Sequence, residues 1–118
     1  MKLYHYSNEQ IDKVEVKYFG DNNFTLNDKK ASSLKRSFFY YDINNIEARF
    51  NNCKLHYTDI KEAYIYDLNI DKLGYKKDFR NFDILLSDIK NAGYKGILYN
   101  IGYLKIVNLF YDIEVKSC

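Results

Sequence analysis

The sequence lacks tryptophan and proline, and it has only two cysteines and two histidines among 118 residues. The cysteines and histidines do not show the spacing of zinc ligands, so we expect no bound metal. No apolar run approaches the length of a membrane span, and the opening segment MKLYHYSNEQ lacks the apolar core of a signal peptide. We therefore expect a cytoplasmic protein that has no membrane partner. The cytoplasm also keeps cysteines reduced.

The short motifs of several large enzyme classes are missing as well. The sequence contains no phosphate-binding loop and no GxGxxG, HExxH, CxxC or GxSxG pattern. These absences argue against the common nucleotide-binding loops, the zinc proteases and the serine hydrolases that depend on such motifs. No pair of carboxylates stands out as an acid–base couple.

The charges are nearly balanced, with 18 basic and 16 acidic side chains and a net charge of +2. A dedicated nucleic-acid-binding domain usually carries a strong basic excess, so we expect no nucleic-acid partner. One local basic cluster follows a loop rich in asparagine, and it consists of Lys29, Lys30, Lys35 and Arg36. Such a cluster is most often a solvated loop, and the alternative is a surface that meets an anionic cofactor or an acidic partner.

Aromatic residues are abundant, with 13 tyrosines and 8 phenylalanines, and hydrophobic residues make up 47% of the chain. Each ring buries a large apolar area, and tyrosine keeps a hydroxyl for the surface or for an interface. A chain of this length fits one domain, so we expect residues 1–118 to form a single unit with its own core.

Residue periodicity predicts an α+β fold. A helical stripe predicts a helix over 78–92 that is capped by Gly93, and a shorter stripe predicts a second helix over 43–50. Alternating apolar residues predict strands at 2–6, 11–18, 37–41, 53–57, 62–70, 95–100, 104–110 and 112–116. Strands interrupted by two main helices favour a mixed, largely antiparallel sheet.

Four segments, taken in order, resemble the ADP-ribosyltransferase-like family. The first is LYHYS at 3–7, which is similar to the family's first strand with its histidine, and the second is SFFYYD at 37–42, which is similar to its aromatic strand. The third is YIYDLNID at 64–71, and the fourth is the run 89–115 with GYKGI near its start. The resemblance implies the family's fold, and it points to the small effectors of phages and mobile elements, some of which inactivate CRISPR proteins.

The resemblance also implies a binding site for NAD. His5 takes the place of the histidine that bonds the adenosine ribose, and the backbone at Tyr6, next to Ser7, takes the place of the group that pairs with the nicotinamide amide. The aromatic residue that stacks on nicotinamide corresponds to Phe38 or Phe39.

The family's catalytic carboxylate has no counterpart at the expected position. The alignment places it at or near Lys105 or Ile106, and no acidic residue occurs between Asp88 and Asp112. A carboxylate there would stabilise the positive charge that develops as nicotinamide leaves, and a lysine has the wrong sign for that role. The remaining candidates, if the fold brings one inward, are Asp42, Asp59 and Asp67.

These observations favour a catalytically degenerate effector in the host cytoplasm that binds and inhibits a host protein, such as a CRISPR or other defence protein. The alternative is an active NAD-dependent mono-ADP-ribosyltransferase that uses an acid from elsewhere in the chain. A third possibility is a plain interaction domain whose motif matches arise by chance, since a fold does not determine a function.

Overall fold

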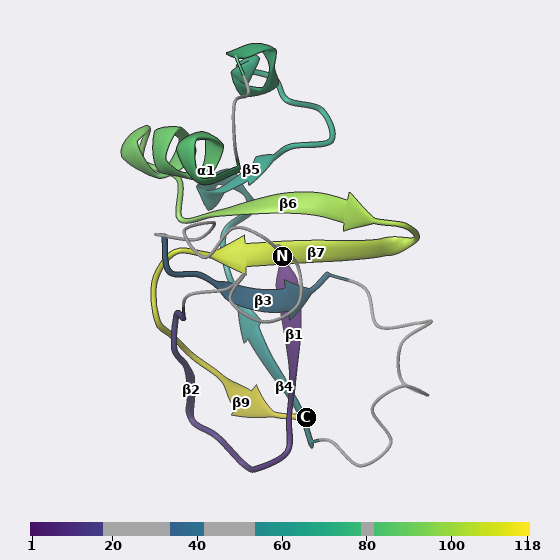
Figure 1. Ribbon diagram of the computed structural model, residues 1–118. Helices are drawn as coiled ribbons and strands as arrows, with labels where there is room; N and C mark the ends of the chain where they lie inside the picture. The colour runs from purple at the N-terminus through teal and green to yellow at the C-terminus, as the bar shows by residue number, and fades with distance from the viewer. Residues whose placement is uncertain (18–33, 42–53, 79–81) are drawn as a thin grey trace, which may run out of the picture.

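One seven-stranded sheet dominates the computed structural model, which describes residues 1–17, 34–41, 54–78 and 82–118 (Figure 1). The strand order is β5-β6-β7-β3-β1-β4-β9. All neighbours are antiparallel except β5 and β6, which are parallel. The strands are β1 (Lys2–Ser7), β3 (Ser37–Tyr40), β4 (Lys54–Asp59), β5 (Ile65–Asp67), β6 (Gly96–Ile101), β7 (Leu104–Leu109) and β9 (Lys116–Ser117). The prediction of a mixed, largely antiparallel sheet is therefore confirmed.

The other elements surround this sheet. Two short strands, β2 (Lys13–Val14) and β8 (Ile113–Glu114), pair with each other, and single turns of 3₁₀-helix form η2 (Glu62–Tyr64) and η3 (Tyr75–Asp78). The described residues contain one α-helix, α1 (Phe82–Asn91), and none of them forms a helix long and apolar enough to cross a membrane. The second helix predicted, at 43–50, lies outside the described residues.

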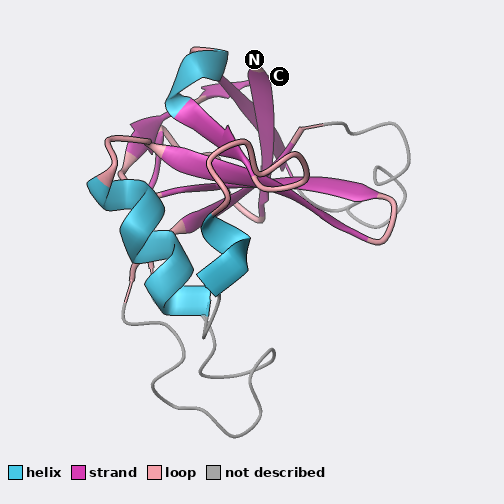
Figure 2. Cartoon of the chain, turned by 90° about the horizontal axis from the view of Figure 1, so that it is seen from above, coloured by secondary structure: helices cyan, strands magenta, loops and turns pink. Residues whose placement is uncertain are grey.

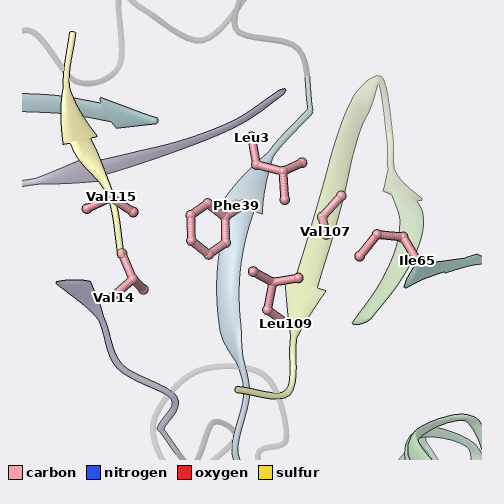
Figure 3. Packing of buried hydrophobic residues seen from close by; sticks show 7 residues of the cluster. All are labelled: Leu3, Val14, Phe39, Ile65, Val107, Leu109 and Val115. Atoms are coloured by element: carbon pink, nitrogen blue, oxygen red, sulfur yellow. The ribbon is translucent and has the colours of Figure 1, made fainter. Parts of the chain in front are cut away.

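The sheet buries apolar side chains on both faces. On one face, the β2–β8 segment contributes Val14 and Val115 to a cluster around Leu3, Phe39 and Leu109 (Figure 3). The other face carries α1, which Figure 2 shows beside the strands. The second cluster joins the buried stripe of the helix to the sheet, and it consists of Tyr66, Leu68, Leu85, Leu86, Ile89, Ile97 and Phe110. The helical stripe is therefore core, as its spacing predicts.

The sheet changes direction between β3 and β1. Strand β1 pairs with β4 over six residues, but it pairs with β3 at Tyr4 and Tyr40 alone. In Figure 1, β1 and β4 accordingly run across the direction of β3, β7 and β6. Past Tyr4 the backbones of β1 and β3 separate, and this separation creates the space in which the candidate site lies.

Several sequence predictions are wrong at their boundaries. The predicted strand 11–18 is a strand only at Lys13–Val14, with an isolated bridge at Lys17, and the predicted strand 112–116 is replaced by the two short strands β8 and β9. The predicted strand 62–70 is a strand only at Ile65–Asp67, because the Asp67 carboxylate accepts hydrogen bonds from the N–H groups of Asn69 and Ile70 and closes a turn. An alternating strand over 62–70 would place Tyr64 and Ile70 on the core face with Tyr66, but Tyr64 lies in η2, Ile70 lies in the turn, and both are exposed. The predicted helix 78–92 is helical from Phe82, and η3 occupies residues 75–78.

Two glycines have positive φ where the chain turns, and the helix cap predicted at Gly93 is confirmed. Gly93 follows α1 with φ of 103°, and Gly102 turns the β6–β7 hairpin with φ of 59°. Both angles lie in the region that favours glycine, so local sequence correctly located the end of the helix and the turn of the hairpin.

Candidate functional site

A cavity of about 610 Å³ opens where β1 and β3 separate. Its walls come from the last residues of β1 (His5–Ser7), from the start of β3 (Ser37 and Phe38), and from the segment 11–17 that crosses in front of them. The site therefore joins two parts of the chain that are far apart in sequence, residues 5–17 and residues 37–38. Four of the five residues that the resemblance assigns to NAD line this one cavity, namely His5, Tyr6, Ser7 and Phe38.

The His5 side chain links β1 to β3 at the point where the backbones of the two strands no longer pair. Its Nδ1 lies 2.8 Å from the carbonyl oxygen of Phe38, and since a carbonyl only accepts, Nδ1 carries the proton and donates it. Burial, the largest effect, lowers the pKa of His5 below its usual value, and the nearby His56 and Lys17 act in the same direction. The ring is therefore neutral at pH 7, and its Nε2 presents a lone pair that accepts a hydrogen bond.

His56 holds the segment in front of the cavity. It is the direct neighbour of His5 on β4, it is fully buried, and its Nε2 accepts a hydrogen bond of 3.2 Å from the backbone N–H of Ile11. Its Nδ1 has no hydrogen-bond partner among the described residues. The sequence predicts no role for His56, because nothing local to β4 indicates that residue 11 lies above it.

The two phenylalanines of β3 point to opposite faces of the sheet, as neighbours on a strand do. Phe39 is 0% exposed, packs in the core and lies with its ring 5.4 Å from the ring of His5. Phe38 is half-buried, and its ring lies 5.5 Å from the Arg36 guanidinium. Of the two stacking candidates, Phe38 borders the cavity but its ring lies on the opposite face of the sheet from the His5 ring, and the ring of Phe39 is covered by the core.

The predicted basic cluster does not form as one exposed surface. Arg36 is only 9% exposed, and its guanidinium lies 5.5 Å from the rings of both Phe38 and Phe82. Burial lowers its pKa, while Tyr99 and Asp83 act to raise it. The expectation of a solvated Arg36 is thus wrong, because the residue anchors β3 against α1. Lys35 is exposed, and the other two members, Lys29 and Lys30, lie outside the described residues.

The positions aligned with the catalytic carboxylate lie away from the cavity. In the β3–β7 ladder, Ile106 pairs with Tyr40 and Leu109 pairs with Ser37, so Lys105 and Ile106 sit at the far end of β3 from the cavity. The Lys105 ammonium instead lies over the Tyr41 ring, 5.6 Å from its centre.

Among the acids proposed as replacements, Asp59 and Asp67 do not line the cavity, and Asp42 lies outside the described residues. Within the described part of the chain, the carboxylate that lines the cavity is Glu15, which the sequence alone does not single out. Glu15 is exposed and lies 3.5 Å from the Lys13 ammonium, so the two charges form an ion pair at the rim. Glu15 lies in a short alternating segment, and this sequence context does not indicate a functional role.

Comparisons with models of protein families, with curated proteins and with solved structures found no match to this chain. In the described part of the chain, no group of three His, Cys, Asp or Glu side chains is placed to hold a metal ion.

Proposed function

We propose that the chain is a small ADP-ribosyltransferase-like effector that holds NAD in the β1–β3 cavity and acts by binding and inhibiting a host protein, such as a CRISPR or other defence protein. The observation that carries the proposal is that His5, Tyr6, Ser7 and Phe38 line one cavity. Its volume of about 610 Å³ lies within the range of about 300–1,000 Å³ that is usual for ligand pockets. The neutral His5 ring, with Nε2 as an acceptor, suits a ribose hydroxyl.

The acids around the cavity support a degenerate rather than an active site. Glu15 is exposed and already paired with Lys13, so it is poorly placed to stabilise a developing positive charge. Positions 105 and 106 carry a lysine and an isoleucine, and both are distant from the cavity along β3. A bound dinucleotide would then stabilise the fold or shape a surface, without being cleaved.

An exposed apolar surface supports the binding of a protein partner. Tyr103 is 63% exposed at the tip of the β6–β7 hairpin, and Ile101 beside it is exposed as well. Asn69 donates a hydrogen bond of 3.3 Å to the side chain of Asn100, which brings the exposed Ile70 close to this tip. Exposed apolar side chains that gather in this way are typical of protein interfaces, and tyrosine is enriched at their energetic centres.

Calorimetric titration of NAD tests the cavity. We expect saturable binding that is lost in His5→Ala and weakened in His5→Asn, whose amide still donates to Phe38 but offers no acceptor at Nε2. Tyr103→Ser is the matched control, because it lies at the hairpin tip and should leave the affinity unchanged. Absence of NAD binding by the folded wild-type protein would overturn the NAD part of the proposal.

Inhibition is tested separately with purified CRISPR nucleases, whose DNA cleavage is measured with and without this protein. We expect inhibition that Tyr103→Ser weakens and that persists when NAD is omitted. A requirement for NAD, together with transfer of labelled ADP-ribose to the nuclease, would instead establish the active transferase.

The active transferase remains the second candidate because Glu15 lines the cavity. In that case Glu15→Gln abolishes the transfer of labelled ADP-ribose and leaves NAD affinity within about twofold. Wild-type protein that binds NAD but transfers nothing excludes this candidate.

A further inference from the structure

Strands β4 and β9 begin as an antiparallel pair and then separate. Tyr57 of β4 is paired with Lys116 of β9, and two residues further in the same register Asp59 would meet Glu114. Glu114 instead belongs to β8, where it pairs with Lys13 of β2. A cavity of about 880 Å³ fills the gap, and both Asp59 and Glu114 border it. This space is far larger than the volume of about 30 Å³ that one bridging water takes, so it has room for a larger group.

The backbone N–H and carbonyl of Asp59 face this cavity. In an antiparallel pair, residues alternate between those that bond the neighbouring strand and those whose backbone groups point away from it. Ile60 bonds towards β1, because its N–H donates to the Met1 carbonyl at 2.9 Å and its carbonyl accepts from the Met1 ammonium at 3.0 Å. Leu55 bonds towards β9, since its carbonyl accepts from the Cys118 N–H at 3.0 Å. Asp59, which alternates with Ile60, therefore points away from β1, and its backbone groups bond none of the described residues.

The backbone of Glu114 faces the same cavity from the opposite wall. The Val115 N–H donates to the Asp12 carbonyl at 2.9 Å, so Val115 bonds towards β2 and its neighbour Glu114 points away from β2. Within the described segments, no residue bonds the N–H or the carbonyl of Glu114. Two unpaired strand edges thus face each other across one cavity, and such edges are templates for pairing with another strand.

Acidic side chains predominate around this cavity. Four carboxylates and two lysines border it, and one of these lysines, Lys13, is paired with Glu15 at 3.5 Å. None of the four carboxylates forms an ion pair with a described residue. A basic side chain would therefore be complementary to the charge of the cavity. The four carboxylates belong to Asp12, Asp59, Asp112 and Glu114.

A second cavity, of about 500 Å³, continues from the acidic one, because Asp59 and Asp112 border both. The backbone fixes one side of it, since the Tyr64 carbonyl accepts from the Lys95 N–H at 2.8 Å. The ammonium groups of Lys61 and Lys95 lie over the Tyr64 ring, 5.9 and 4.5 Å from its centre. An apolar side chain suits this part of the space, whose apolar lining consists of Ile60, Tyr64, Leu109, Tyr111 and Ile113.

From these features we infer that the two joined cavities bind an extended peptide segment of a partner protein. The segment adds as a strand that pairs with Asp59 and Glu114, and it places a basic side chain in the acidic cavity and an apolar side chain in the other. Strand addition of this kind takes its affinity from backbone hydrogen bonds and its specificity from pockets for alternate side chains. The inference goes beyond the proposed NAD site, since His5, Tyr6, Ser7 and Phe38 do not border either cavity.

A library of random peptides of about six residues, a usual strand length, tests the inference when it is displayed on yeast and selected on the folded protein. We expect the enriched peptides to combine a basic with an apolar residue and to lack a central proline. Asp59→Pro removes the outward N–H and the charge at an edge that tolerates proline, so it should weaken these peptides about tenfold in calorimetry.

Asp59→Asn separates the charge from the backbone, because it keeps the N–H. This variant should weaken the enriched peptides about threefold and reduce the salt dependence of their binding. Asp88→Asn is the matched control, since Asp88 is an exposed acid on α1 and its replacement should leave the affinity unchanged. His5→Ala should also bind the peptides like the wild type, so a failure of the NAD proposal leaves this inference standing.

Hydrogen exchange of the backbone amides, measured by NMR on the wild-type protein, reports strand addition directly. A bound peptide should slow the exchange of the Asp59 and Glu114 N–H groups, and unchanged exchange at both would overturn the inference. Thermal unfolding checks that Asp59→Pro is folded, and Glu114→Pro makes the same change on the opposite wall. A selection that enriches no peptide, or peptides that bind folded Asp59→Pro as well as the wild type, would also overturn it. Peptides that depend on Tyr103 instead would assign binding to the β6–β7 hairpin tip and exclude the strand site.

Discussion

Substitution of the two adjacent phenylalanines of β3, Phe38 and Phe39, should distinguish a residue of the core from a residue beside the cavity. Phe39 is fully buried among apolar side chains, and truncation of such a residue to alanine costs about 3–5 kcal/mol in lost burial and in the cavity that remains. For 118 residues the unfolding entropy is roughly 0.25 kcal/mol/K. Phe39→Ala should therefore lower the melting temperature by roughly 12–20 °C.

Phe38 should behave differently because it is half-buried and its ring lies 5.5 Å from the Arg36 guanidinium. A cation–π contact together with partial burial contributes about 1–2 kcal/mol, so Phe38→Ala should lower the melting temperature by roughly 4–8 °C. This variant should stay folded at room temperature, so its NAD affinity can be measured. Because the Phe38 ring lies on the face opposite to the His5 ring, we expect that affinity to be close to that of the wild type.

Circular dichroism during heating gives both melting temperatures, and calorimetry on the folded variants gives the NAD affinities. A Phe39→Ala protein that melts within about 4 °C of the wild type would refute the assignment of this ring to the core. A larger loss of stability in Phe38→Ala than in Phe39→Ala would refute the assignment of faces on β3.

Three further predictions concern stability. Gly96→Ala should lower the free energy of unfolding, measured by urea denaturation, by about 3 kcal/mol or more, because a Cβ there collides with the Asn108 carbonyl. Gly102→Ala is strained only by its φ and should lower the free energy of unfolding by about 1 kcal/mol. Burial raises the pKa of Tyr66 to about 12, so stability should fall between pH 10 and about 12, less steeply in Tyr66→Phe. Burial lowers the pKa of His5, so stability should fall as pH drops below about 6.5, less steeply in His5→Asn. An unchanged pH profile in either variant would contradict its assignment.

Elements with strong local signals could be predicted from the sequence. The aromatic alternation at 37–41, the hairpin turn at Gly102 and the helical stripe of α1 depend on residues that are close along the chain. These signals required no knowledge of tertiary contacts, which is why β3, the β6–β7 hairpin and the end of α1 lie close to where the sequence predicts them.

The prediction failed where side chains, rather than periodicity, determine the backbone. Residues 62–70 alternate like a strand, yet the carboxylate of Asp67 closes a turn after β5. Asp71, whose φ is 49°, then accepts hydrogen bonds from the Tyr66 hydroxyl and from the N–H groups of Tyr75 and Lys76. Such bonds compete with a sheet ladder, and an alternating pattern gives no indication of them.

The site could be predicted only in part for a related reason. The NAD residues of β1 and β3 came from a resemblance in local motifs, and most of them do line one cavity. The roles of Glu15 and His56 depend on contacts between distant segments, such as the bond from Ile11 to His56. Arg36 was misassigned because the burial of a charged residue depends on the helix that covers it.

The pairing of β3 with β7 places the position of the missing carboxylate away from the cavity. Lys105 adjoins Tyr41, whose N–H donates to the Lys105 carbonyl, and Tyr41 lies three residues beyond Phe38. At about 3.3 Å per residue, a side chain at position 105 starts roughly 10 Å along the sheet from the cavity. An acid introduced there would therefore not reach a ligand in the cavity, so Lys105→Glu should not create transferase activity. Among the described residues, the carboxylate that could take part in catalysis in this cavity is Glu15, and its ion pair with Lys13 opposes that role.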